Sequence, residues 1–88
     1  MRNIEVPVAA PIAAALATRE LVVVHASMRY GRKPYEGPPD GFDVTLAHIS
    51  GKGAAVTGSG ATLLEALDRA RAAFDQYVRP DLPRLRRQ

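Results

Sequence analysis

The spacing of hydrophobic residues changes once along the chain, near Gly60, and this change limits the fold more than any other feature. From residue 21 to that point apolar and polar residues alternate as in β-strands, and beyond it apolar residues recur at helical spacing. Strand-like segments cover residues 21–30, 42–49 and 54–57, and the helical pattern runs to about residue 78. This β-β-β-α order predicts an α+β fold, in which one main helix covers one face of an antiparallel three-stranded sheet.

The N-terminal segment is the least determined part of the pattern. Residues 2–8 are compatible with a short strand, which would make the sheet four-stranded, or with an extended arm. Pro11 suits the first turn of a helix, and the alanine-rich residues 12–19 follow it. We therefore divide the chain into an N-terminal arm or short helix (residues 1–20), a β-β-β-α domain (21–79) and a basic C-terminal tail (80–88).

Two segments rich in glycine are predicted to connect the strands. Residues 31–41, "GRKPYEGPPDG", contain too much glycine and proline for a regular element. A loop of this length in a small domain commonly has a binding role. Residues 51–53, "GKG", supply the glycines of a tight hairpin turn before the third strand.

The first strand, "LVVVHASMRY", is predicted to have two different faces. Strict alternation places one set of side chains on one face: Val22, Val24, Ala26, Met28 and Tyr30. It places the other set opposite: Leu21, Val23, His25, Ser27 and Arg29. We expect the second set to point away from the main helix, on the exposed face of the sheet.

The residues around Thr62 predict how the main helix begins. Thr62 and Glu65 have the spacing of a capping box, in which each side chain accepts a hydrogen bond from the backbone N–H of the other residue. The expected apolar stripe is Leu63, Leu67, Ala70, Phe74 and Tyr77, widened by Ala66 and Ala73, with ion-pair spacing at Glu65–Arg69 and Arg71–Asp75. Gly58 and Gly60 are assigned to the turn before the helix. They are not assigned to phosphate binding, because Leu63 and Leu64 replace the residues of a phosphate loop and Glu65 would repel an anion.

Two stretches of the chain resemble the HicB-like antitoxin domain, within a partial match over roughly residues 40–74. Residues 40–46, "DGFDVTL", are similar to the opening of that family's second strand, and residues 57–67, "TGSGATLLEAL", to its helix start. Ala61 and Leu64 depart from the acidic residues usual in the family. The resemblance implies a partial ribonuclease-H-like fold without nuclease activity, which binds and blocks a small toxin of the double-stranded-RNA-binding type.

The exposed face of the first strand and the loop after it are the predicted contact surface for a protein partner. The residues are Leu21, Val23, His25, Arg29, Arg32, Lys33 and Tyr35. The alternation of basic and aromatic residues leaves a second function open, a stand-alone nucleic-acid-binding protein. Its residues are Arg29, Tyr30, Arg32, Lys33, Tyr35, Arg84, Arg86 and Arg87. A third is an accessory protein of a phage or mobile element that inhibits a host defence complex, and high alanine, arginine and glycine usage fits a bacterial or phage source.

The sequence predicts no catalytic, metal or cofactor site, and we expect a protein that is not an enzyme. The chain has no cysteine, which excludes thiolate chemistry. Asp40, Asp43 and Glu65 are the nearest approach to the carboxylate cluster of a two-metal nuclease, but they are interpreted as surface acids and a helix cap. His25 and His48 are not expected to share a metal ion.

The size of the chain favours self-association. A domain of 88 residues has a thin core, so a homodimer is expected. The sequence Ala15-Leu16-Ala17 resembles a signal-peptidase site, but Glu5 and two prolines interrupt the apolar segment before it. No stretch has transmembrane length, and we expect a cytoplasmic location with no membrane partner.

Overall fold

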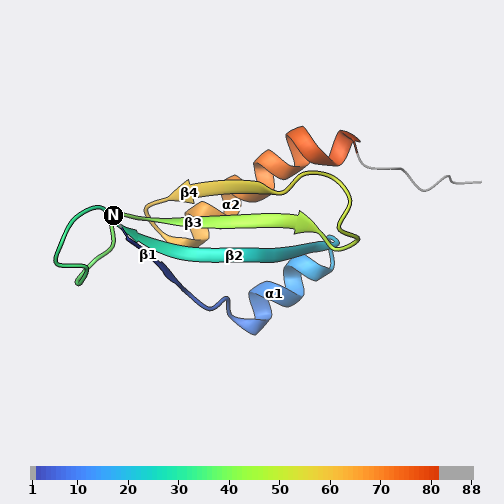
Figure 1. Ribbon diagram of the computed structural model, residues 1–88. Helices are drawn as coiled ribbons and strands as arrows, with labels where there is room; N and C mark the ends of the chain where they lie inside the picture. Colours follow the sequence, from blue (N-terminus) through green and yellow to red (C-terminus); the bar gives the residue numbers. More distant parts are fainter. Residues whose placement is uncertain (1, 82–88) are drawn as a thin grey trace, which may run out of the picture.

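The computed structural model describes residues 2–81, which form a four-stranded sheet and two α-helices (Figure 1). The elements, in chain order, are β1 (Arg2–Glu5), α1 (Ala10–Ala17), β2 (Leu21–Tyr30), β3 (Gly41–His48), β4 (Val56–Gly60) and α2 (Leu63–Ala73). A π-helical turn (Phe74–Val78) and a short 3-10 turn (Arg79–Asp81) extend α2. The predicted α+β fold is confirmed.

The sheet is antiparallel throughout, and its strands lie in the order of the sequence, β1-β2-β3-β4. The N-terminal segment contributes both elements left open above, an edge strand and a short helix. β1 pairs with the last four residues of β2, from Arg2 opposite Tyr30 to Glu5 opposite Ser27. The chain then leaves the sheet, and Pro11 lies in the first turn of α1.

Both helices cover the same face of the sheet, and the core lies between them and the strands. Leu16 is the buried residue of α1. It belongs to the same hydrophobic cluster as Leu67 of α2 and Phe74 of the π turn. The strands contribute Leu21, Ala26, Val44 and Leu46 to this cluster. The opposite face of the sheet carries polar side chains such as Thr45 and Thr57, which share a hydrogen bond of 2.7 Å.

The third predicted strand is displaced, because two glycines assigned to a turn are strand residues. β4 covers Val56–Gly60 and not residues 54–57. An ideal Cβ built on Gly58 would overlap the backbone of Ala66 and Ala70, so only glycine lets α2 lie so close to β4. Glycine is therefore required here for close packing of the helix on the strand. The local sequence does not distinguish such a glycine from one in a turn.

At the start of α2 one half of the predicted capping box forms, whereas among residues 2–81 the reciprocal bond from the Thr62 N–H to the Glu65 carboxylate does not, and the end of the helix also differs from the prediction. The Thr62 hydroxyl accepts a hydrogen bond of 3.1 Å from the N–H of Glu65, and the Glu65 carboxylate pairs with Arg69 at 2.8 Å. At the other end Tyr77 is 66% exposed and Val78 is buried, so the predicted apolar stripe is wrong there. The π turn explains the change, because its extra residue per turn rotates position 77 away from the core.

The second predicted ion pair of α2 is also wrong. Arg71 lies 3.6 Å from Asp68, and Asp75 instead receives a hydrogen bond of 2.9 Å from Arg79. Asp75 also lies 3.9 Å from Arg19, just after α1. This exchange of partners leaves Arg71 facing α1 rather than the end of its own helix.

Candidate partner-binding site

A β-bulge in β2 decides which of its side chains are exposed. The register with β3 shifts between Val23 and His25, so Val24 is an extra residue in the ladder. As a result Val22 and Val24 are 44% and 60% exposed, whereas Leu21 is 2% exposed and Val23 packs against the core. The prediction that Leu21 and Val23 lie on the exposed face is therefore wrong. Strict alternation fails because one inserted residue exchanges the two faces.

The edge of β2 that faces β1 is only partly covered. Pairing with β1 stops at Glu5, and the last contact is a hydrogen bond of 2.9 Å from the Val6 N–H to the Ala26 carbonyl. Within residues 2–81, the segment from Leu21 to His25 pairs with a strand on one side only, through β3. A β-strand edge in this condition presents backbone N–H and C=O groups that a further strand can bind.

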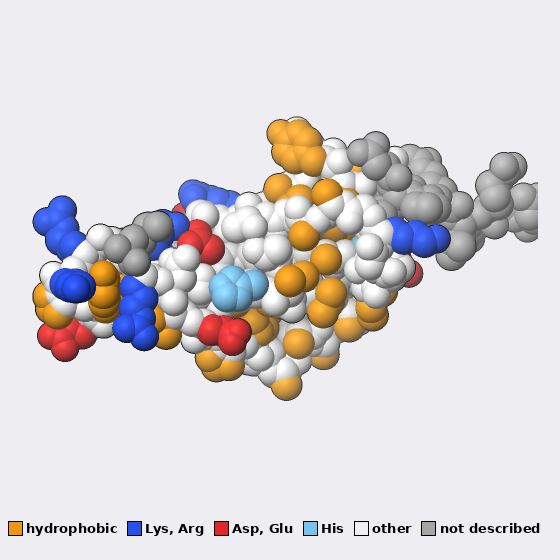
Figure 2. Space-filling model, in the orientation of Figure 1, with side chains coloured by type: hydrophobic (Ala, Val, Ile, Leu, Met, Phe, Trp, Pro, Cys, Tyr) orange, Lys and Arg blue, Asp and Glu red, His pale blue; other side chains and the backbone are white. Residues whose placement is uncertain are grey.

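An open groove, which we call the edge groove, lies between this part of β2 and the departing N-terminal segment. It has a volume of about 290 Å³. It is lined by Glu5, Val6 and Val8 of the N-terminal segment, by Ala13 of α1 and by residues 22–26 of β2. Figure 2 shows hydrophobic side chains gathered over this part of the sheet and α1. The groove therefore combines an unpaired strand edge with apolar side chains.

The loop between β2 and β3 is held by residues that the sequence had assigned to binding. Arg29 forms an ion pair of 2.8 Å with Asp43, and the Tyr30 hydroxyl donates to the Gly37 carbonyl at 2.8 Å. The N–H of Gly31 donates to the Asp40 carboxylate. Arg29 and Tyr30 are thus engaged within the protein, and Tyr30 is buried.

The remaining loop residues are open to solvent. Arg32 and Lys33 are exposed and form no ion pair within residues 2–81, and Tyr35 is half-buried. The other predicted basic residues, Arg84, Arg86 and Arg87, lie outside the described residues. The structure therefore leaves two cations and one aromatic ring of the predicted nucleic-acid surface accessible in this loop.

The histidines and carboxylates do not assemble into a common site in the described part of the chain. His25 is exposed opposite Thr45, whereas His48 contacts Glu20 at 3.1 Å and Ser50 at 2.6 Å. Asp43 accepts hydrogen bonds from Arg29 and from the Ser59 hydroxyl. Among residues 2–81, no three histidine, aspartate or glutamate side chains are grouped so as to hold a metal ion.

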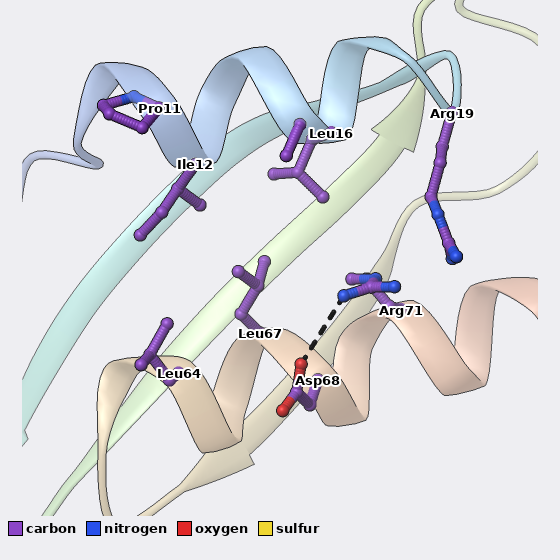
Figure 3. Close-up of a pocket in the computed structure, with 9 residues that line it drawn as sticks. Pro11, Ile12, Leu16, Arg19, Leu64, Leu67, Asp68 and Arg71 are labelled. Carbon is purple, nitrogen blue, oxygen red and sulfur yellow. Dashed lines mark ion pairs between the residues drawn. The ribbon is translucent and has the colours of Figure 1, made fainter.

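A second groove, which we call the interhelical groove, separates α1 from α2 (Figure 3). Leu16 and Leu67 point toward each other across it, and Arg19 and Arg71 lie together at one end. Sequence reasoning missed this site, because its walls come from segments about fifty residues apart. The one local signal is Leu64, a leucine at a position of α2 that is 59% exposed.

No family model, no curated protein and no solved structure matches this chain. The resemblance to the HicB-like antitoxin domain therefore stays a prediction. Within residues 2–81, no helix combines the length and the apolar character needed to cross a lipid bilayer.

Proposed function

We propose that this protein is a non-enzymatic, antitoxin-like binding module that occludes a small protein partner. The partner lays an extended segment along the edge groove, where it pairs with residues 21–25 of β2. The observation that carries the proposal is the one-sided pairing of this segment beside the exposed side chains of Val22 and Val24. Addition of a strand to a sheet edge is a recurrent mode of peptide recognition, in which backbone hydrogen bonds supply much of the affinity.

The groove also indicates what the bound segment contains. Five residues of β2 span about 17 Å, so a segment of similar length is recognised. Val22 and Val24 favour an apolar or β-branched side chain opposite them, because such pairs stabilise antiparallel strands. Glu5, exposed at the rim, favours a basic residue next to that position. This chemistry suits the toxin-like partner implied by the family resemblance, and equally a subunit of a defence complex.

The experiment is a binding measurement with variants that change the groove but not the core. The candidate partner is the product of a small reading frame beside the gene or, failing that, a protein captured from lysate and then purified. We expect Val24→Asp to weaken binding at least tenfold, because it places a charge against the added strand. Tyr77→Asp is the matched control, since Tyr77 is equally exposed but lies beyond the end of α2. Equal affinity of both variants and the unmodified protein would exclude the edge groove.

The exposed side chains of Arg32 and Lys33 favour the alternative, nucleic-acid binding. The salt dependence of the affinity separates it from this proposal. An apolar strand interface changes little in affinity between about 50 and 200 mM salt, whereas phosphate binding weakens steeply over that range. Binding of RNA or DNA that is lost at the higher salt and in an Arg32→Gln, Lys33→Gln variant would favour the alternative. Sedimentation at increasing concentration tests the expected homodimer, which would use the same strand edge.

A further inference from the structure

The interhelical groove joins an apolar trough to a charged end. Its floor is formed by Leu16 and Leu67, both of which are buried, and Ile12 and Leu64 line its walls. The volume is about 310 Å³, within the range of sites that take small molecules. An apolar ligand in the trough would bury the exposed side chains of Leu64 and Ala15 and the half-buried Ile12, over a floor that is already closed to water.

The charged end holds two guanidinium groups that are only loosely engaged. Arg71 approaches Asp68 at 3.6 Å and Arg19 approaches Asp75 at 3.9 Å, and both distances exceed that of a hydrogen bond. The Nε atom of Arg71 is buried, and no residue among 2–81 accepts a hydrogen bond from it. Asp68 is the one carboxylate among the described residues that line the groove, and Asp75 lies just outside the lining, beside Arg19 and Arg79. Three guanidinium groups therefore face two carboxylates, which leaves a net positive charge at this end.

We propose that the interhelical groove binds a medium-chain fatty acid. The alkyl chain lies along the trough, and the carboxylate is bound by Arg71 with help from Arg19. Guanidinium and carboxylate groups match in planar geometry and form strong charge-assisted hydrogen bonds. Leu64 and Arg71 are seven residues apart on α2, about 10 Å along the helix axis, which is the length of an extended chain of about eight to ten carbons.

A fatty acid fits this groove better than a peptide does. The walls are α-helices, whose backbone N–H and C=O groups are bonded within the helix and offer nothing to a bound chain. A peptide in the trough would therefore bury amide groups without partners, which is costly. An alkyl chain needs no such partners, and its single polar group coincides with the positive end.

The test is titration of the full chain with octanoate and decanoate below their aggregation limits, followed by amide NMR shifts and calorimetry. We expect shifts at α1 and α2 and an affinity about tenfold higher for decanoate, because two further methylenes are buried. Decanol, which has no charge, should bind at least about tenfold more weakly than decanoate, the loss expected for a hydrogen bond to a charged group. Arg71→Gln should lower decanoate affinity by a similar factor, whereas Arg69→Gln, on the same helix but bonded to Glu65 and Ser59, should not.

A second pair of variants tests the trough without altering charge. Ala15 and Ala14 are neighbouring exposed residues of α1, and Ala15 lines the groove whereas Ala14 does not. Ala15→Phe should block decanoate binding, and Ala14→Phe should leave it unchanged. Shifts confined to the edge groove, equal binding of decanol, or binding of a peptide with a free C-terminus in place of decanoate would each overturn the proposal. Its failure would leave the edge-groove proposal standing, because the two sites share neither residues nor assay.

Discussion

Replacement of Gly58 by alanine tests whether α2 packs on β4 as described. The added Cβ would overlap the backbone nitrogen of Ala70 and the backbone oxygen of Ala66, and it would lie 2.8 Å from the Ala70 Cα. Carbon atoms in contact are normally about 3.5–4.0 Å apart, so α2 must move away by about 1 Å. These are backbone atoms of a helix that covers the core, so rotation of a side chain offers no relief.

The cost follows from what α2 buries. Leu67 of α2 and Phe74 of the π turn that extends it are large buried side chains, and each contributes about 1.5–3 kcal/mol to the free energy of unfolding. A gap of about 0.5–1 Å forfeits a quarter to a half of the contact energy. The expected loss is therefore about 1–3 kcal/mol, which also agrees with the usual cost of overpacking. Replacement of a strand glycine without such contacts by alanine would instead raise the free energy of unfolding, by about 0.4–1 kcal/mol, because alanine restricts the unfolded chain.

The assay is urea unfolding followed by far-ultraviolet circular dichroism. In thermal unfolding of the same protein, the predicted loss lowers the melting temperature by at least about 4 °C for a chain of this size. Gly31→Ala is the control, since its Cβ would meet only the flexible Asp40 side chain, and we expect a change below about 1 kcal/mol. A Gly58→Ala protein as stable as the unmodified chain would refute the close packing of α2 on β4.

Three further changes test separate features by the same unfolding assay. Val24→Asp should lower the free energy of unfolding by less than about 1 kcal/mol, because the bulge exposes this side chain. Strict alternation places Ala26 on the same face, but Ala26 is buried, so Ala26→Asp should lower it by at least about 3 kcal/mol. Equal losses in the two variants would contradict the bulge. Tyr30→Phe should lose about 0.5–1.5 kcal/mol and speed amide exchange in residues 31–40, because the bond to the Gly37 carbonyl is removed; unchanged exchange would show that this bond does not hold the loop. Thr62→Ala should lose about 1 kcal/mol with the helix cap, and a neutral effect would argue against that cap.

The features that the sequence predicted correctly are those fixed by local chemistry. They are strand β2, the hydroxyl cap at Thr62 and the i,i+4 pair between Glu65 and Arg69. Each of them depends on neighbours within a few residues. The errors in the faces of β2 and in the bounds of β4 arise from tertiary contacts, whereas the error at Tyr77 arises from the π turn. The bulge at Val24 exchanges the faces of β2, and Gly58 is a strand residue only because α2 lies against it.

The candidate site was predicted in part. The sequence prediction and the edge groove both involve strand β2, and His25 lines the groove, but Leu21 lies in the core. Arg29 was assigned to binding because its charge is visible in the sequence, whereas its pairing with Asp43 depends on the register of two strands. The interhelical groove could not be predicted, since no local pattern indicates that Arg19 and Arg71 line the same end of one groove.

Amide hydrogen exchange on the free protein and on its complex with a purified partner tests the central proposal most directly. A strand added to the edge groove slows the exchange of backbone amides in residues 21–25, and the Val24→Asp variant removes this protection. Protection that appears at residues 31–37 or along α2, with none in residues 21–25, would contradict the account.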